Sequence, residues 1–198
     1  MNYIGAASEM IIIIIGLLLL SVVKKSYIYG IIALLILCSI LYFYRGATIP
    51  PLYPNTIISP ADGKILKIVK HENMYHIAIF LNIHNIHVQY APIEGQIISM
   101  KYKPGKFNPA YLFEKSQFNE RMETILETNI GQIMVVQIAG LIARTIVPFK
   151  EIGDKLDQGE ALGLIKFGSR VDIWLPDIVE LKMKEGDRIR VGDIVATY

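Results

Sequence analysis

Two uncharged, strongly apolar runs lie in the first 45 residues, and they limit the fold more than any other feature of the chain. One run covers residues 10–23 and the other covers residues 26–44, and two lysines separate them. The second run nearly reaches the length of about 20 apolar residues that a helix needs to cross a bilayer. The sequence therefore predicts a membrane anchor of one or two transmembrane helices over residues 1–48, followed by a separate domain over residues 49–198.

The residues around these runs bear on the anchor and its orientation. A cleaved signal peptide is the alternative for the first run, but the residues before it include Glu9 and neither lysine nor arginine,. Aromatic residues bracket the second run as they do at membrane boundaries: Tyr27, Tyr29, Tyr42, Phe43 and Tyr44. The positive-inside rule would place Lys24 and Lys25 in the cytoplasm, which for a hairpin leaves the following domain outside.

Charge and cysteine content exclude several classes of protein. The chain of 198 residues has a formal net charge of +2, and its lysines and arginines form no basic stripe. Nucleic acid is therefore not an expected partner. The single cysteine, Cys38, lies in the second apolar run, so neither an intramolecular disulfide nor a cysteine-based metal site is expected,.

From residue 56 onward the chain has the pattern of a β protein. Short runs rich in Ile, Val and Tyr are separated by Gly, Pro and Asp, which is typical of strands joined by tight turns,. Only residues 111–122 are expected to be partly helical. The pattern predicts a mainly β barrel or sandwich with few short helices. The expected strands are 56–59, 64–69, 76–81, 87–90, 96–102, 124–127, 133–138, 144–148, 161–167, 171–175 and 194–197.

Two similar stretches, Ile152-Gly-Asp-Lys-Leu156 and Val191-Gly-Asp-Ile-Val195, predict tight hairpins of the kind found in lipoyl- and biotinyl-type barrels,. Those barrels carry a modified lysine on an exposed hairpin of its own. Lys182 and Lys184 instead run directly into a Gly-Asp turn, so we interpret them as solvated strand charges.

Three stretches contain side chains used in nucleophilic catalysis. Asp62 lies between Pro and Gly, His84 and His87 are three residues apart, and Gly168 precedes Ser169 between two strand-like runs. A serine whose proton is taken by a histidine, itself oriented by an aspartate, is an activated nucleophile. Asp62, His87 and Ser169 could fill these three roles.

Each stretch also has a simpler interpretation. Asp62 and the Gly168–Ser169 pair are ordinary turn residues, and a histidine can be a packed core residue. A zinc site at His84 and His87 is a further alternative, but residues i and i+3 of a regular strand face opposite ways. No third ligand has supporting spacing, so the sequence favours no metal site.

Four motifs in order give the chain a specific resemblance. They are Ser59-Pro-Ala-Asp-Gly63, His87-Val-x-x-x-Pro92, Asn119-Glu-Arg121 and Phe167-Gly-Ser-Arg-Val-Asp172. From about Asn55 to its end, the chain resembles the phosphatidylserine decarboxylase family, in particular its short prokaryotic branch. The resemblance implies that the chain cuts itself between Gly168 and Ser169, giving a β chain of residues 1–168 and an α chain of residues 169–198. In that scheme His87 is the base for Ser169 and Asp62 orients His87.

The same resemblance implies the activity. Ser169 would become a covalent pyruvoyl group, the only cofactor, which acts as an electron sink. The enzyme, a carboxy-lyase made as a zymogen, would convert a serine phospholipid, either phosphatidylserine or archaetidylserine, to the ethanolamine phospholipid and carbon dioxide. The expected partners are this lipid, the membrane and, as in some relatives, a second copy of the chain. A biosynthetic role favours a catalytic domain on the cytoplasmic face of the cell membrane, against the weaker argument from Lys24 and Lys25.

Some residues depart from the family pattern or have open roles. Gln89 and Tyr90 stand where the short branch tends to have Asn-Arg, which puts a phosphate-binding arginine there in doubt. His84 could protonate the decarboxylated intermediate or simply pack. A group of lysines near a Pro-Gly loop could bind the lipid phosphate: Lys101, Lys103 and Lys106. The alternative functions are a non-enzymatic, membrane-anchored lipoyl-like binding barrel and a zinc-dependent hydrolase.

Overall fold

The computed structural model describes residues 3–50, 53–141, 145–165 and 168–198. The chain divides into two compact units, Met1–Arg45 and Gly46–Tyr198. The first unit contains helices α1 (Tyr3–Val23) and α2 (Tyr27–Phe43), and the described part of the second contains strands β1 to β14 and the short helix α3.

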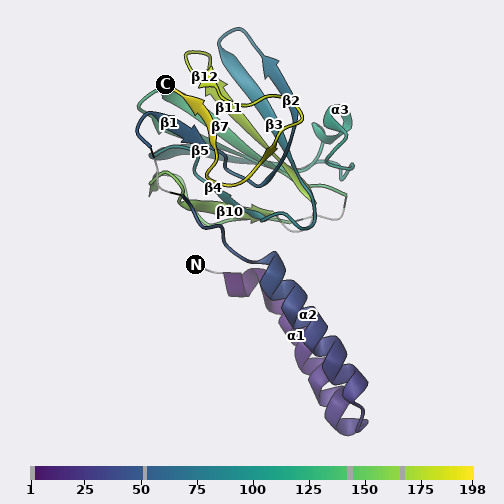
Figure 1. Ribbon diagram of the computed structural model, residues 1–198. Coiled ribbons are helices and arrows are strands. Elements are labelled where there is room, and N and C mark those ends of the chain that lie inside the picture. Colours follow the sequence, from purple (N-terminus) through teal and green to yellow (C-terminus); the bar gives the residue numbers. More distant parts are fainter. Residues whose placement is uncertain (1–2, 51–52, 142–144, 166–167) are drawn as a thin grey trace. The chain divides into compact units, whose positions relative to one another are not determined.

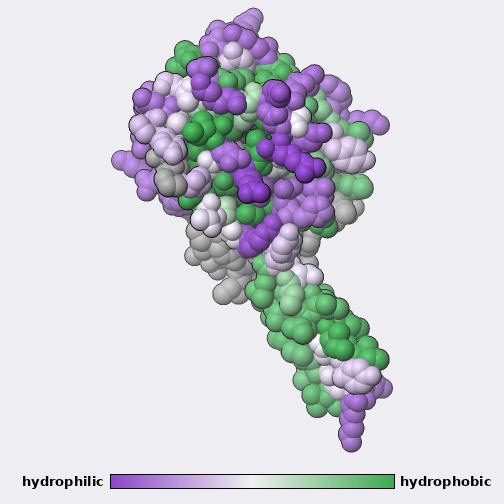
Figure 2. Space-filling view, viewed as in Figure 1, coloured by the Kyte–Doolittle hydropathy of each residue, from purple (hydrophilic) through white to green (hydrophobic). Residues whose placement is uncertain are grey.

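Helices α1 and α2 form a hairpin and lie side by side (Figure 1). At the turn between them, Lys25 has a φ of 48°, and the Ser21 hydroxyl donates to the carbonyl oxygen of Ser26 over 3.1 Å. Apolar side chains cover much of the hairpin surface, which is green in Figure 2.

Among the residues whose structure is described, no helix is both long and apolar enough to cross a membrane. The prediction of one or two transmembrane helices is therefore not supported. Helix α2 has 17 residues. At about 1.5 Å per residue it is shorter than a hydrocarbon layer of about 30 Å.

The second unit is built around one curved sheet (Figure 1). This sheet has eight antiparallel strands in the order β13-β2-β3-β11-β7-β6-β5-β9. This arrangement, with only one short helix in the described part of the unit, confirms the predicted mainly β fold. The strands are β2 (Gly63–Lys70), β3 (Met74–Leu81), β5 (Gly95–Lys103), β6 (Arg121–Thr128), β7 (Gly131–Ile138), β9 (Lys155–Leu156), β11 (Ser169–Pro176) and β13 (Arg188–Ile189). Two-residue strands such as β9 and β13 escaped the sequence analysis because they are too short to show an alternating pattern.

Two smaller antiparallel sheets complete the domain, with orders β1-β14-β12 and β4-β10-β8. Their strands are β1 (Thr56–Ile58), β4 (Val88–Tyr90), β8 (Ile146–Pro148), β10 (Ala161–Ile165), β12 (Glu180–Leu181) and β14 (Ile194–Thr197). Strands β10 and β11 thus belong to different sheets, and the Gly168–Ser169 pair does not form a β-hairpin turn. Residues 144, 166 and 167 of the predicted strands lie outside the described residues.

The Gly-Asp turns are tight, but they also join strands of different sheets and are not the predicted hairpins. The carboxylate of Asp154 accepts a hydrogen bond from the backbone N–H of Glu151 over 2.8 Å, and Asp193 accepts one from Arg190 over 2.7 Å. The glycine before each aspartate has a φ near +90°, which a residue with a side chain rarely adopts,. Each aspartate therefore closes its own turn, whatever strand follows.

Strand β11 lies in the middle of the long sheet, between β3 and β7, and its two faces differ. Val171, Ile173 and Leu175 face the main hydrophobic core. The alternate residues face the other side, where the segment carrying α3 (Phe113–Ser116) lies next to them. The helix is much shorter than the segment 111–122 predicted to be partly helical, because polar side chains in this segment bond the backbone instead,.

Candidate active site

The Gly168–Ser169 bond lies at the start of strand β11. Gly168 has a φ of +64°, a conformation that glycine adopts without strain,. Ser169 is paired with Leu81 of β3 and is completely buried. Its hydroxyl has no hydrogen-bond partner among the described residues. A buried hydroxyl without a partner is costly and uncommon, which points to a chemical role for this side chain.

His87 lies directly against this bond. Its Nε2 atom accepts a hydrogen bond from the backbone N–H of Gly168 over 3.1 Å. Its Nδ1 atom is 2.8 Å from the carbonyl oxygen of Asn85, which can only accept a proton. The proton therefore resides on Nδ1, and Nε2 presents a lone pair to the Gly168–Ser169 segment. This tautomer is the one that a general base for Ser169 needs.

Asp62 supports His87 through the backbone. One carboxylate oxygen accepts from the N–H of Ile86 over 3.3 Å, and the other accepts from the N–H of Val191 over 2.7 Å. The aspartate thus fixes the residue before His87 to the last part of the chain. The predicted role of Asp62 in orienting the His87 imidazole stays a prediction.

Gly140 is a residue of this site that the sequence analysis missed. A Cβ atom on Gly140 would overlap the carbonyl oxygen of Gly168 and lie 3.1 Å from its carbonyl carbon. The backbone at position 140 therefore packs directly against the carbonyl group that would be attacked. A glycine after a predicted strand gave no signal of this contact, because the two residues are far apart in sequence.

Two buried glutamines lie behind His87. The Gln89 amide donates to the carbonyl oxygen of His87, and the Gln137 amide donates to Gln89 over 2.6 Å. Tyr90, at the position where an arginine was expected, uses its hydroxyl to accept from the N–H of Ala47 over 2.7 Å. The two glutamines support His87, and Tyr90 holds the chain at Ala47. None of the three supplies a positive charge.

The other predicted residues line another cavity, form an ion pair or are exposed. His84 is in an exposed turn and lines a separate cavity of about 310 Å³ with Lys64 and Arg188. Lys103 forms an ion pair of 2.8 Å with Glu123, while Lys101 and Lys106 are exposed. The phosphate-binding role of the lysines and the protonating role of His84 stay predictions.

The Asn119-Glu-Arg121 motif fixes a loop to the sheet. The Asn119 side chain is fully buried, and it donates to the carbonyl oxygens of Asn108 and Ala139, each over 2.8 Å. Arg121 forms its ion pair with Glu123 over 2.9 Å. Because Ala139 precedes Gly140, Asn119 also holds the backbone that packs against Gly168.

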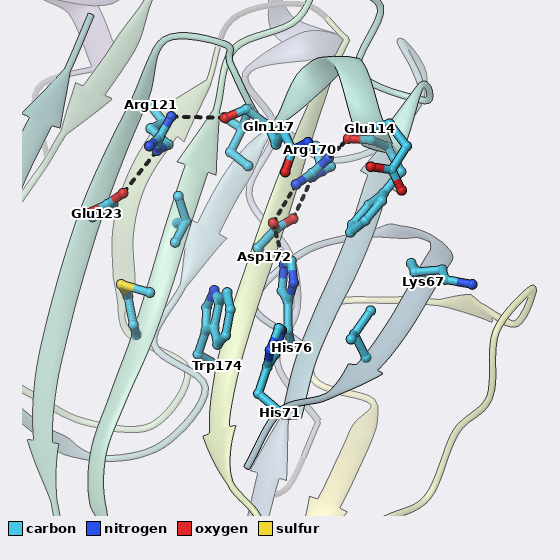
Figure 3. A pocket seen from close by; sticks show the side chains of 15 residues that line it. Lys67, His71, His76, Glu114, Gln117, Arg121, Glu123, Arg170, Asp172 and Trp174 are labelled. Atoms are coloured by element: carbon cyan, nitrogen blue, oxygen red, sulfur yellow. Dashed lines mark hydrogen bonds and ion pairs between the residues drawn. The ribbon is translucent and has the colours of Figure 1, made fainter. Parts of the chain in front are cut away.

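The opposite face of β11 carries a buried ionic cluster (Figure 3). Arg170, Asp172 and Trp174 alternate along the strand and line a cavity of about 490 Å³ together with His76 of β3. The Asp172 carboxylate binds both Arg170 and His76. His76 joins this cluster because β3 pairs with β11, a neighbourhood that no pattern within either strand indicates.

A metal centre receives no support from the geometry: within the described part of the chain, no three His, Cys, Asp or Glu side chains are grouped as metal ligands. A pyruvoyl group, by contrast, fits what is present. It would form from Ser169, whose buried hydroxyl is unpaired among the described residues and whose neighbour Gly168 contacts His87.

Comparisons with known proteins agree with this geometry. Residues 39–197 match the family model described as phosphatidylserine decarboxylase. A phosphatidylserine decarboxylase proenzyme from Desulfotalea psychrophila is 40% identical over 188 residues, which cover 90% of this chain and 88% of that protein. One from Carboxydothermus hydrogenoformans is 40% identical, covering 82% of this chain and 81% of the relative. A putative archaetidylserine decarboxylase proenzyme from Methanococcoides burtonii is 38% identical, covering 71% of this chain and 65% of the relative. The chain belongs to the phosphatidylserine decarboxylase family.

Proposed function

We propose that this chain is a proenzyme that cuts itself between Gly168 and Ser169 and then decarboxylates a serine phospholipid. The names of the relatives support the decarboxylase activity and the proenzyme state. The observation that carries the proposal is the buried hydroxyl of Ser169, which has no partner among the described residues and follows a glycine whose N–H contacts His87.

The cleavage follows from the groups at this bond. Ser169 Oγ attacks the carbonyl carbon of Gly168 while His87 Nε2 takes the hydroxyl proton, and breaking the C–N bond leaves an ester with a free amine on residue 169. Loss of the Cα proton of residue 169 then breaks the Cβ–O bond and releases Gly168 as a carboxylate. Residue 169 becomes dehydroalanine, and water replaces its nitrogen, which leaves as ammonia.

The pyruvoyl group that results supplies a carbonyl that takes up the electron pair left when carbon dioxide departs. The chain's own residues hold it in place. Residue 169 stays paired with Leu81 on β3, and β11 stays paired with β7, so the α chain remains within the sheet after the cut. His87 is beside it and can carry a proton at Nε2.

The substrate in this proposal is phosphatidylserine or archaetidylserine, since relatives are named for each. Both lipids have the same serine headgroup, and only apolar contacts could separate their tails. The exposed apolar side chains of the α1–α2 hairpin, such as Ile12, Leu19 and Val22, support association of the protein with a membrane,. The proposal places the catalytic domain at the cytoplasmic face, where the lipid would be made. It leaves a homodimer as a further prediction.

The test is the intact mass of the purified protein, followed by an assay on vesicles that contain phosphatidylserine. We expect a fragment of residues 169–198 that is lighter by one ammonia than simple hydrolysis would give, together with conversion of the lipid to its ethanolamine form. A single uncut chain without activity would overturn the proposal and favour the non-enzymatic binding barrel. A cut chain that is inactive on both lipids would overturn the substrate and keep the cleavage.

A further inference from the structure

After the cut, residue 169 becomes a chain end at the edge of its site. The ends of strands fray when nothing holds them, and the reacting group must keep its position beside His87. We propose that Arg170, held by Asp172 and His76, anchors the new N-terminus of the α chain. This inference rests on the proposed self-cleavage and adds a positioning role for the residue that follows the cut.

Arg170 is almost completely buried, with 1% of its surface exposed. Its Nε and Nη2 atoms donate to the two carboxylate oxygens of Asp172, each over 2.7 Å. Its Nη1 atom donates to Ser116 Oγ over 2.7 Å and to the carbonyl oxygen of Phe113 over 3.0 Å. The guanidinium therefore makes four hydrogen bonds, and two of them form the bidentate arrangement that fixes both distance and orientation.

The cluster joins the two chains that the cut would produce. Arg170 and Asp172 lie in the α chain, whereas Ser116 and Phe113 lie in the β chain. His76, also in the β chain, binds the Asp172 carboxylate through Nε2 over 2.6 Å. Its ring is stacked on Trp174, with centroids 4.3 Å apart and an angle of 5° between the planes (Figure 3). The first residues of the α chain are thus attached to β3 and to the α3 segment by directional bonds.

At the cut end of β11, an ionic cluster specifies the position of the strand better than apolar packing would. Buried ion pairs add little stability compared with apolar side chains of the same size, but they can specify a single arrangement. A strand that slips by one residue turns every side chain to the opposite face. At a cut end, such a slip would move residue 169 out of the core-facing position beside His87. The bonds from Arg170 to Ser116 and Phe113, and from Asp172 to His76 on β3, cross to the β chain and therefore favour one register. The bidentate pair within β11 fixes the orientation of the two side chains that make these bonds.

The anchor should matter far more after the cut than before it. In the precursor, the peptide bond to Gly168 holds residue 169 from one side and β11 holds it from the other. After the cut, only the β11 side remains. The proposal therefore predicts that weakening the cluster frees the first residues of the α chain in the cut protein and has little effect on them in an uncut one. A purely structural role predicts the same effect in both.

The experiment measures hydrogen exchange of the backbone amides in residues 170–173 by mass spectrometry. The substitution Arg170→Lys keeps the charge and removes the bidentate geometry. It is made in the self-cleaving chain and in the uncleavable Ser169→Ala chain. We expect exchange to become faster by about tenfold or more in the cut protein and by less than about twofold in the uncut one. Cleavage should still go to completion, while the kcat on phosphatidylserine vesicles falls by about 10- to 100-fold.

Arg121→Lys is the matched control, because Arg121 lines the same cavity and forms an ion pair but is not next to the cut. It should leave exchange at residues 170–173 unchanged in both backgrounds. If Arg170→Lys does not fold, His76→Gln gives the same comparison, since it weakens the cluster and leaves the Arg170–Asp172 pair intact.

The possible results separate the two levels of the proposal. Equal acceleration of exchange in cut and uncut protein, or an unchanged kcat, would overturn the anchor and leave the proposed function standing. An uncut wild-type chain would overturn the proposed function, and the anchor with it.

Discussion

Ser169 and Arg170 are neighbours on β11, and both are polar and buried, yet their surroundings are opposite. The Ser169 hydroxyl faces the core side and has no hydrogen-bond partner among the described residues. The Arg170 guanidinium faces the other side and makes four hydrogen bonds. Alternation along one strand is enough to separate them. In the proposed mechanism, β11 therefore carries the nucleophile Ser169 on its core side, the reactive face. It carries the hydrogen-bonded Arg170 and Asp172 on its other side, the anchored face.

This difference explains how a buried polar group can be kept available for chemistry. Within the described residues the Ser169 hydroxyl lacks a partner, as the Thr124 hydroxyl does, which costs stability,. Ser169 differs from Thr124 because the residue before it, Gly168, contacts His87. A fully bonded arginine one residue later holds the backbone that carries the hydroxyl. Reactivity and positioning thus come from consecutive residues and do not compete for the same partners.

The largest effect is expected from removing the Ser169 hydroxyl. Ser169→Ala should leave one uncut chain, because no other atom at this bond can make the ester. The variant should be no less stable than the wild-type precursor, since an unsatisfied hydroxyl is removed, with a gain of up to about 1 kcal/mol. Denaturing electrophoresis and intact mass report the cut.

Thr124→Val is the matched control for that substitution. Thr124 is also fully buried, and within the described residues its hydroxyl likewise lacks a hydrogen-bond partner, but it lies on β6. This variant should cleave at the normal rate. Two-chain product from Ser169→Ala would contradict the assignment of the nucleophile.

The anchored face is tested by removing its central carboxylate. Asp172→Ala leaves Arg170 buried without its counter-charge, and breaking such a pair costs about 3–5 kcal/mol. The free energy of unfolding is best measured by urea titration in the uncleavable Ser169→Ala chain, because two separate chains do not unfold as one unit. A loss below about 1 kcal/mol would show that water reaches the guanidinium and that this face is not fixed.

Much of this arrangement could be predicted from the sequence, and the reasons for the failures are physical. The strands around Ile77, Val135 and Ile173 show clear apolar patterns. The motif order predicts Asp62, His87 and Ser169 as the catalytic residues, and these roles stay predictions. Gly140 and His76 could not be found, because their contacts depend on which strands are neighbours in the sheet. The pattern in one strand indicates which residues share a face but not what covers that face.

The prediction of transmembrane helices is not supported and the hairpin prediction was wrong, for related reasons. Apolar composition over residues 26–44 does not fix where a helix ends, and α2 ends at Phe43 after 17 residues. A Gly-Asp pair such as Gly192-Asp193 indicates a tight turn, yet it does not reveal that the strands on its two sides belong to different sheets.

Gly140→Ala tests the packing around the Gly168 carbonyl group. A methyl group there must displace the carbonyl group of Gly168, and a misplacement of about 1 Å at a reacting centre costs about 100-fold in rate,. We expect cleavage to slow by about that factor, which corresponds to about 2.7 kcal/mol in the barrier. The rate is measured as the appearance of the α chain after synthesis in a cell-free system.

Gly95→Ala is the control for this effect. A Cβ at position 95 would lie 2.6 Å from the carbonyl oxygen of Glu127, so it also overpacks a backbone group, but on strands β5 and β6. Both variants should lose stability, and only Gly140→Ala should cleave slowly. Equal slowing would mean that cleavage reports general strain in the fold.

The smallest effect is expected from Glu123, at the rim of the anchored face. Burial opposes ionisation of Glu123, but hydrogen bonds from Lys103 and Arg121 lower the pKa of its carboxyl overall. Because the folded pKa lies below the usual value of 4.5, the stabilisation is complete above that pH and is lost as pH falls through the folded pKa,. The Lys103 side chain is 38% exposed, so solvent screens the pair. Glu123→Gln should therefore cost no more than about 1 kcal/mol at pH 7.

Urea titrations of Glu123→Gln at pH 7 and in acid, again in the uncleavable chain, check both the size and the sign. The stability difference should shrink below pH 4.5 and vanish once Glu123 is protonated. Asp172→Ala should stay several times more destabilising at pH 7, since Asp172 is buried and Glu123 is at the rim. Equal losses of stability from the two substitutions would contradict this view. Burial would then give the Arg170–Asp172 pair no advantage over a partly exposed ion pair such as Arg121–Glu123.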